Sequence, residues 1–543
     1  MKRSCVGTAL VVLAGLASVA GAEDFDKALS AYRSWIKRPS LHKRTLGRER
    51  LASTQDMRAL QILAQSYGKA EAPRDQVQYL IVNIAADFYA ESEHLPIYAA
   101  WREKHRKPQD AWLWYQSLIP HLENAGPQDL LAIARNERDV CLRAAAIEAL
   151  RFRQDPAVLE LIPELAEKLP TKKVARALIL ESLTAALYTQ RDKRSEEVFR
   201  VPAEALIRRM DEDATLPRTR IVMGRYLSRT FGVKYVWRSG KRWMAELNQA
   251  QHGSMQGSLK GYATFAGIEA TGDRICYVID MSDSMLTPLT PRVIEKLPKG
   301  PVSGVNARVR EEKLSKNAEW KKAFAQVKWD KVKNRFDAAR ELLKASLVGL
   351  KEDQYYAVMW FGDGAGLLNS TKGLRKATLK SVRATMRELD SIRPGSKKRN
   401  RPHGTLRGAT NMHGGLHRAF KLRGSGLVGA YEYVNPRTWS AGCDTIFLLT
   451  DGVPTWDDWP NQDRKDPLDR AGDPESGHKT NDAPTLNFPG PYRRTHHLLE
   501  DVRRLNLFRK VEIHCVGMGE ANMNTLSAIA SIGKGEALNL TGK

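Results

Sequence analysis

The apolar residues of the first half of the chain recur at helical spacing. Between residues 24 and about 230 they fall three or four positions apart, which is typical of helices that bury one face. In VCLRAAAIEAL, residues 140–150, this face comprises Val140, Ala144, Ile147 and Leu150. Asp155 and Pro156 then have the form of a cap and a first helical residue, and predict the start of the next helix. The first half is therefore predicted to be all helical.

The pattern changes after this region. Residues 231–262 become rich in Gly, Ser and Gln, and predict a linker. From residue 263 onwards, short and almost continuously apolar runs such as Ile275–Ile279, YYAVMWF and TIFLLT alternate with amphipathic helical stretches. This order predicts an α/β doubly wound, mostly parallel sheet that is covered by helices on both faces. In open sheets of that kind, binding sites lie at the carboxyl ends of the strands.

Small oxygen-bearing side chains follow two of these predicted strands. Asp280, Ser282 and Ser284 come directly after the first strand, and Asp451 follows TIFLLT. Thr410 lies in a turn that opens a predicted helix. Carboxylate and hydroxyl oxygens, together with water, are the ligands that Mg²⁺ prefers. These residues therefore predict a divalent metal site, with Mg²⁺ as the first candidate and Mn²⁺ or Ca²⁺ as the alternatives.

The same motifs carry a resemblance to a known family. DMSDS at residues 280–284, GATNM at residues 408–412 and LLTDGVPT at residues 448–455 are similar, in order and spacing, to the metal-ion-dependent adhesion site of von Willebrand factor type A domains. VEIHCVGMG, residues 511–519, resembles a late strand of that fold. The resemblance covers about residues 263–543 and implies a domain that binds a protein ligand.

The resemblance also implies a role for each residue of the site. Ser282, Ser284 and Thr410 would supply hydroxyl ligands, Asp280 and Asp451 would act partly through water, and an Asp or Glu carboxylate of the partner would complete the coordination. Asp283 departs from the family, which usually has glycine at this position. A residue between two ligands in a turn is expected to face solvent; the alternative is an added acidic group that tunes the metal affinity.

A second resemblance concerns the helical half. VCLRAAAIEAL, residues 140–150, and DPAVLELIPELAEKL, residues 155–169, are similar to the first and second helices of a HEAT-type repeat. The similarity is specific for this one repeat and general for the rest of residues 23–230. Stacked repeats share a core and offer an extended surface to partners, whereas an irregular all-helical domain would have no such role. Both interpretations stay open at this point.

The first 22 residues predict an exported protein. Lys2 and Arg3 precede an apolar run from Val6 to Val19, and small residues up to Ala22 follow, which is the form of a cleavable signal peptide. A buried first helix is the alternative. No later segment of the sequence is apolar for long enough to span a bilayer. The expected location is the periplasm, the cell surface or the extracellular medium.

The charge of the chain adds an alternative function. Its 86 Lys and Arg residues exceed its 62 Asp and Glu residues, which gives a net charge of +24. A basic protein of this kind can bind a polyanion through its helical repeats. The polyanion could be RNA, because helical repeats followed by a von Willebrand-type domain also resemble the Ro ribonucleoprotein, or an anionic polysaccharide. The predicted export argues against RNA, since structured RNA partners are intracellular.

Signatures of enzymes are missing from the sequence. It contains no Gly-x-Ser-x-Gly elbow and no His-Glu-x-x-His pair. His496 and His497 are adjacent, which is a poor geometry for shared metal ligation on one helix. A non-enzymatic binding protein is therefore expected. Residues 286–328, 393–407 and 456–492 are long insertions relative to a compact domain of the family, and they are expected to emerge near the metal, either as a cap or as solvated loops.

Overall fold

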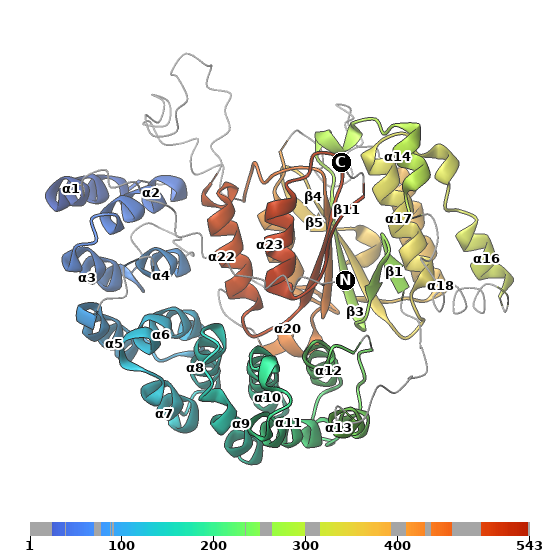
Figure 1. Ribbon diagram of the computed structural model, residues 1–543. Coiled ribbons are helices and arrows are strands. Elements are labelled where there is room, and N and C mark those ends of the chain that lie inside the picture. The colour runs from blue at the N-terminus through green and yellow to red at the C-terminus, as the bar shows by residue number, and fades with distance from the viewer. Residues whose placement is uncertain are drawn as a thin grey trace, which may run out of the picture.

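The computed structural model describes residues 24–38, 40–69, 78–86, 88, 92–233, 235–249, 263–298, 315, 317–392, 409–428, 436–458 and 490–540. The predicted signal peptide (residues 1–22) and the insertion at residues 393–407 lie outside these ranges, as does most of the insertion at residues 456–492. Figure 1 shows the helices of the first half as an arc that curves around part of the second half.

The first half is helical, as predicted, and its helices stack in two layers. The even-numbered helices α6, α8, α10 and α12 pack on one another in succession, and so do the odd-numbered helices α7, α9, α11 and α13. The even-numbered helices form the inner layer of the arc (Figure 1). The helices are α1 (Phe25–Trp35), α2 (Leu41–Ala52), α3 (Met57–Ser66), α4 (Tyr79–Ala86), α5 (Leu95–Lys104), α6 (Ala111–Ala125), α7 (Gln128–Asn136), α8 (Val140–Phe152), α9 (Val158–Glu167), α10 (Lys173–Thr189), α11 (Glu197–Met210), α12 (Pro217–Phe231) and α13 (Gly240–Gln249).

Two details of the helical half differ from the sequence pattern. Helix α9 begins at Val158, two residues after Pro156, because the carboxylate of Asp155 accepts a hydrogen bond from the amide of Ala157 at 2.9 Å and closes a turn. Part of the segment that was expected to be a linker forms α13. This helix packs on α11 and buries Trp243 completely. Apolar side chains four residues apart anchor α13, as on any helix that covers a core.

The second half contains a mixed, mostly parallel sheet. The strands β11, β10, β9, β3 and β4 lie side by side and parallel, and β5 and β6 pair with β4 in the antiparallel direction. The strands of the second half are β1 (Ala263–Phe265), β2 (Ile268–Ala270), β3 (Arg274–Asp280), β4 (Tyr355–Phe361), β5 (Ala365–Leu367), β6 (Arg375–Lys376), β7 (Leu422–Arg423), β8 (Gly426–Leu427), β9 (Thr445–Thr450), β10 (Glu512–Gly517) and β11 (Ala537–Asn539).

Helices cover both faces of this sheet, as predicted. Successive side chains of a strand point to opposite faces. Tyr277 of β3 packs in the core beneath α17 and α18, whereas Cys276 and Val278 pack in the core beneath α19, α22 and α23. The helices of the second half are α14 (Pro291–Lys296), α16 (Ala318–Phe324), α17 (Arg335–Gly349), α18 (Leu379–Ser391), α19 (Met412–Phe420), α20 (Pro436–Ala441), α22 (Thr495–Asn506) and α23 (Met523–Gly533).

The inner layer of the arc packs on the amino ends of the strands. Arg225 of α12 donates to the carbonyl oxygen of Asp444 at 2.7 Å and to the hydroxyl of Thr445 at 2.8 Å, where β9 begins. Arg229, one turn later, pairs with Glu512, the first residue of β10. The helical half therefore contacts the edge of the sheet opposite to the carboxyl ends, where the metal site is predicted.

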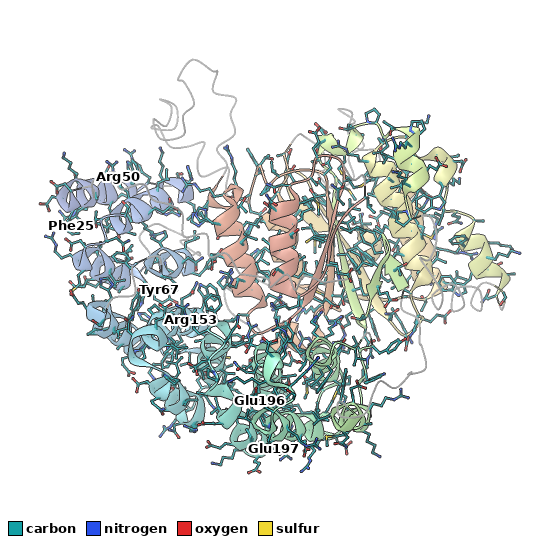
Figure 2. The ribbon with its side chains drawn as sticks, viewed as in Figure 1. Phe25, Arg50, Tyr67, Arg153, Glu196 and Glu197 are labelled. Carbon is teal, nitrogen blue, oxygen red and sulfur yellow. The ribbon has the colours of Figure 1, made fainter. Side chains whose placement is uncertain are left out.

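Buried charged side chains also contribute to the interface between the helical half and the second half. In α10 the carboxylate of Glu181 accepts from Arg218 at 2.7 Å, and also from the indole of Trp439 in α20 at 3.3 Å. Glu148 of α8 accepts from Lys510, which precedes β10, at 2.5 Å. Burial favours the neutral form of Glu148, but the positive charges around it hold its pKa below the usual value. Away from this interface, Glu197 of α11 is exposed on the outer side of the arc (Figure 2).

Candidate functional site

Four of the five predicted metal ligands lie at or just after the carboxyl ends of β3 and β9. These strands are parallel neighbours, and the pair Ile279 and Leu449 sets their register. The next residues are Asp280 and Thr450, and the hydroxyl of Thr450 donates to the carboxylate of Asp280 at 2.5 Å. The second oxygen of Asp280 accepts from the amide of Ser282 at 2.8 Å. Both oxygens of this buried carboxylate are thus held in place before any ligand binds.

A chain of hydrogen bonds links the two strand ends. The hydroxyl oxygens of Ser282 and Ser284 lie 2.9 Å apart, and the hydroxyl of Ser284 donates to the carboxylate of Asp451 at 2.7 Å. Asp280, Ser282 and Asp451 are buried, while Ser284 is exposed. The structure therefore brings these predicted ligands together at the carboxyl edge of the sheet. Asp283 is exposed, as expected for a residue between two ligands.

Thr410 lies two residues before α19 and contacts the loop that follows β9. Its amide donates to the hydroxyl of Thr455 at 2.8 Å, and its carbonyl oxygen accepts from the amide of Thr455 at 3.1 Å. A Cβ atom placed on Gly452 would lie 3.4 Å from the hydroxyl oxygen of Thr410. Thr410 is therefore fixed against the loop that follows Asp451, although its hydroxyl makes no described hydrogen bond to the other four predicted ligands.

The site concentrates negative charge in a buried position. Burial raises the pKa of Asp280 to about 7, and the neighbouring carboxylate of Asp451 adds to this increase. Two carboxylates that share a buried site disfavour each other's ionised form. A cation between them would remove this repulsion. The oxygen atoms fit a hard divalent cation, because the set contains carboxylates and hydroxyls and neither an imidazole nor a thiolate.

The sequence did not point to Arg335, which also belongs to this site. Its guanidinium donates to Asp451 at 2.7 Å, through the carboxylate oxygen that Ser284 does not use. The Arg335 side chain is 14% exposed and that of Asp451 is fully buried. A Cβ atom on Gly519, whose φ is +60°, would clash with the guanidinium, so this glycine makes room for it. A basic residue in the first turn of a helix is unfavourable for the helix dipole, and that is the one local signal for Arg335.

The described ends of two insertions also lie at this edge. The first insertion begins beside the site, near Thr287. After this insertion the chain comes back to the same place, where the amide of Arg335 donates a hydrogen bond to the carbonyl oxygen of Thr287 at 3.2 Å. At the start of the third, Asp458 accepts from Asn411 at 2.8 Å and from Arg418 at 2.6 Å. Both insertions are therefore anchored beside the candidate ligands.

Comparison with known proteins adds no identification. The chain matches no known family model and no curated protein. Within the part of the chain that the structure describes, no helix is both long and apolar enough to cross a lipid bilayer.

The structure also brings together a second group of side chains, which the sequence analysis did not predict as a metal site. His496 and His497 lie at the start of α22, and Glu49 of α2 reaches both of them from the helical half. The sequence pattern showed only an adjacent pair of histidines, because the third side chain is 448 residues from His497. Folding thus supplies a partner that local spacing cannot reveal.

Proposed function

We propose that the second half is a von Willebrand factor type A domain that binds an acidic group of a protein partner through a divalent cation. The observation that carries the proposal is the hydrogen-bonded chain from Asp280 through Ser282 and Ser284 to Asp451, at the carboxyl edge of a parallel sheet. The cation, with Mg²⁺ as the first candidate, would offer its remaining coordination positions to water and to a carboxylate of the partner.

Each residue of the candidate site would have its own role in binding the cation. Asp280 and Asp451 balance the positive charge, and Thr450 and Ser282 keep the Asp280 carboxylate in one orientation. The hydroxyls of Ser284 and Thr410 would select for oxygen-preferring cations. Arg335 neutralises Asp451 whenever no cation is bound. These roles require no proton transfer and no nucleophile, which supports a binding protein rather than an enzyme.

The helical half is proposed to be a HEAT-like array in an exported protein. Its alternating layers and its α8–α9 pair support this proposal. Arginines of its inner layer, including Arg218 and Arg225, are engaged in ion pairs and hydrogen bonds inside the molecule. These two arginines hold the molecule together and are not offered to a polyanion. The cluster of carboxylates and hydroxyls at the ends of β3 and β9 is the observation that favours the metal-dependent function over the RNA or polysaccharide alternative.

Calorimetric titration with Mg²⁺ and Mn²⁺ tests the proposal. The wild-type chain is compared with the Asp280→Ala, Asp451→Ala double variant, and Asp283→Ala serves as the matched control because this exposed carboxylate lies between the candidate ligands. Saturable binding that the double variant loses and Asp283→Ala keeps supports the proposal. Binding that all three proteins share, or no binding by the folded wild type, contradicts it.

A carboxylate probe then tests the partner chemistry. We expect a poly-glutamate peptide to bind in the presence of Mg²⁺, to be released by EDTA, and to bind the double variant weakly. If the peptide instead binds equally with EDTA and is lost steeply as salt rises, the basic surface is responsible. That outcome favours the polyanion-binding alternative.

A further inference from the structure

Three side chains of kinds that commonly bind metals meet between the two halves of the molecule, and none of them belongs to the site described above. Glu49 lies in α2, and His496 and His497 are the second and third residues of α22. Their candidate ligand atoms all lie within 4.8 Å of one another. Figure 1 shows α2 next to one end of α22. The group therefore connects the N-terminal end of the arc to the second half of the chain.

The distances suit a small metal ion. One carboxylate oxygen of Glu49, Oε1, lies 2.8 Å from Nε2 of His497 and 3.8 Å from Nε2 of His496. Tetrahedral Zn²⁺ with bonds of about 2.0–2.1 Å would place its ligand atoms about 3.3 Å apart. The observed distances lie on either side of this value, and all the candidate ligand atoms lie within 4.8 Å of one another, so coordination requires the side chains to move apart or together around the ion. Both imidazoles face Glu49 through the same ring nitrogen, Nε2.

A neighbouring arginine orients the Glu49 carboxylate. Arg494 donates to the other oxygen of Glu49, Oε2, at 2.7 Å, which leaves Oε1 turned toward the imidazoles. Ligating carboxylates are commonly oriented by such outer hydrogen bonds.

We propose that Glu49, His496 and His497 bind a divalent transition metal ion, with Zn²⁺ as the first candidate, and that this ion fastens α2 to α22. One carboxylate and two imidazoles form a ligand set that Zn²⁺ takes readily and Mg²⁺ does not. A fourth coordination position stays open for water or another ligand. This site is separate from the proposed Mg²⁺ site in both position and chemistry.

Zinc binding by the untagged full-length chain tests the proposal. The chain is titrated with Zn²⁺ against a chromophoric chelator, in excess Mg²⁺ so that oxygen-rich sites are already filled. The decisive variant is His496→Ala, because this side chain is 61% exposed and its loss leaves the packing of α22 intact. His121→Ala is the matched control, since His121 pairs only with Asp129, at 2.7 Å, among the described acidic residues.

We expect one equivalent of Zn²⁺ per chain and a Zn²⁺-dependent rise in the melting temperature. Loss of one ligand should weaken binding by about 100-fold or more, because loss of even an outer partner costs about 10–100-fold. The same loss is expected for Glu49→Gln, while His121→Ala and the Asp280→Ala, Asp451→Ala variant should bind Zn²⁺ normally. The proposal is overturned if the wild type shows no saturable Zn²⁺ binding, or if His496→Ala and Glu49→Gln bind as the wild type does.

Discussion

Arg335 is predicted to limit the affinity of the candidate site for divalent cations. Its guanidinium supplies a positive charge to Asp451, 2.7 Å away, in the place where a cation would supply its own. Substitution Arg335→Gln removes this charge and keeps a polar side chain. We expect the variant to bind Mg²⁺ more tightly than the wild type and to be less stable when Mg²⁺ is absent.

The size of the effect follows from the charges. Two unit charges 4 Å apart interact by about 4 kcal/mol at an effective dielectric constant of about 20. A divalent cation at twice that distance from the guanidinium would therefore be repelled by about the same amount. Because the Arg335 side chain is 14% exposed, water and ions screen part of this repulsion. We expect a net gain of about 1.4–2.8 kcal/mol, which is a tenfold to hundredfold lower dissociation constant.

The metal-free variant should lose stability for the complementary reason. Removing one partner of a buried ion pair leaves an uncompensated charge and typically costs about 3–5 kcal/mol. Asp451 is fully buried and has Asp280 beside it, so its carboxylate depends on Arg335. The partial exposure of Arg335 places the expected loss at the lower end of this range. Addition of Mg²⁺ should recover more stability in the variant than in the wild type.

Isothermal titration with Mg²⁺ and thermal unfolding with and without Mg²⁺ measure both effects. Arg340→Gln is the matched control: Arg340 lies on the same helix, is 13% exposed and pairs with Asp337 and Glu341 rather than with Asp451. If Arg335→Gln weakens Mg²⁺ binding, the guanidinium acts by orienting Asp451 and the reasoning is refuted. Equal affinities of the two variants would refute it as well.

Three further predictions concern stability. Glu181→Gln should lower the free energy of unfolding by about 3–5 kcal/mol in urea titrations, because it leaves Arg218 buried without its carboxylate partner. Gly272→Ala should reduce the melting temperature strongly, since its Cβ atom would lie 1.7 Å from the carboxylate of Asp444. The pKa of Lys534 is lowered to about 8, chiefly by burial, against 10.5 when unfolded. The unfolded chain therefore binds more protons between pH 8 and 10.5, so stability should rise with pH there, and Lys534→Met should flatten this rise in pH-dependent melting curves.

Local patterns in the sequence were sufficient for the long strands and helices of the second half, for the helical nature of the first half and for much of the candidate site. Apolar runs predicted β3 and β9, and the parallel direction of these strands brings Asp280 and Asp451 to one edge. The role of Arg335 could not be predicted from local patterns, because an insertion separates this residue from Ser284 in the sequence. Only the packing of α17 brings its side chain next to Asp451. The same limit applies to α13: a composition rich in glycine and glutamine concealed the spacing that buries its apolar face.

The way the two halves pack together bears on how a partner would reach the candidate site. The inner helices of the arc contact the amino ends of β9 and β10, through Arg225 and Arg229, so they hold the sheet by the edge opposite to Asp280. A partner carboxylate can then approach the carboxyl edge without displacing the helical half. The inner layer, in turn, is occupied by the chain's own second half, so any external partner of the helices must use their outer layer. A partner that needs both halves would have to span from that outer layer to the carboxyl edge, and substitutions on the two surfaces would then weaken its binding independently.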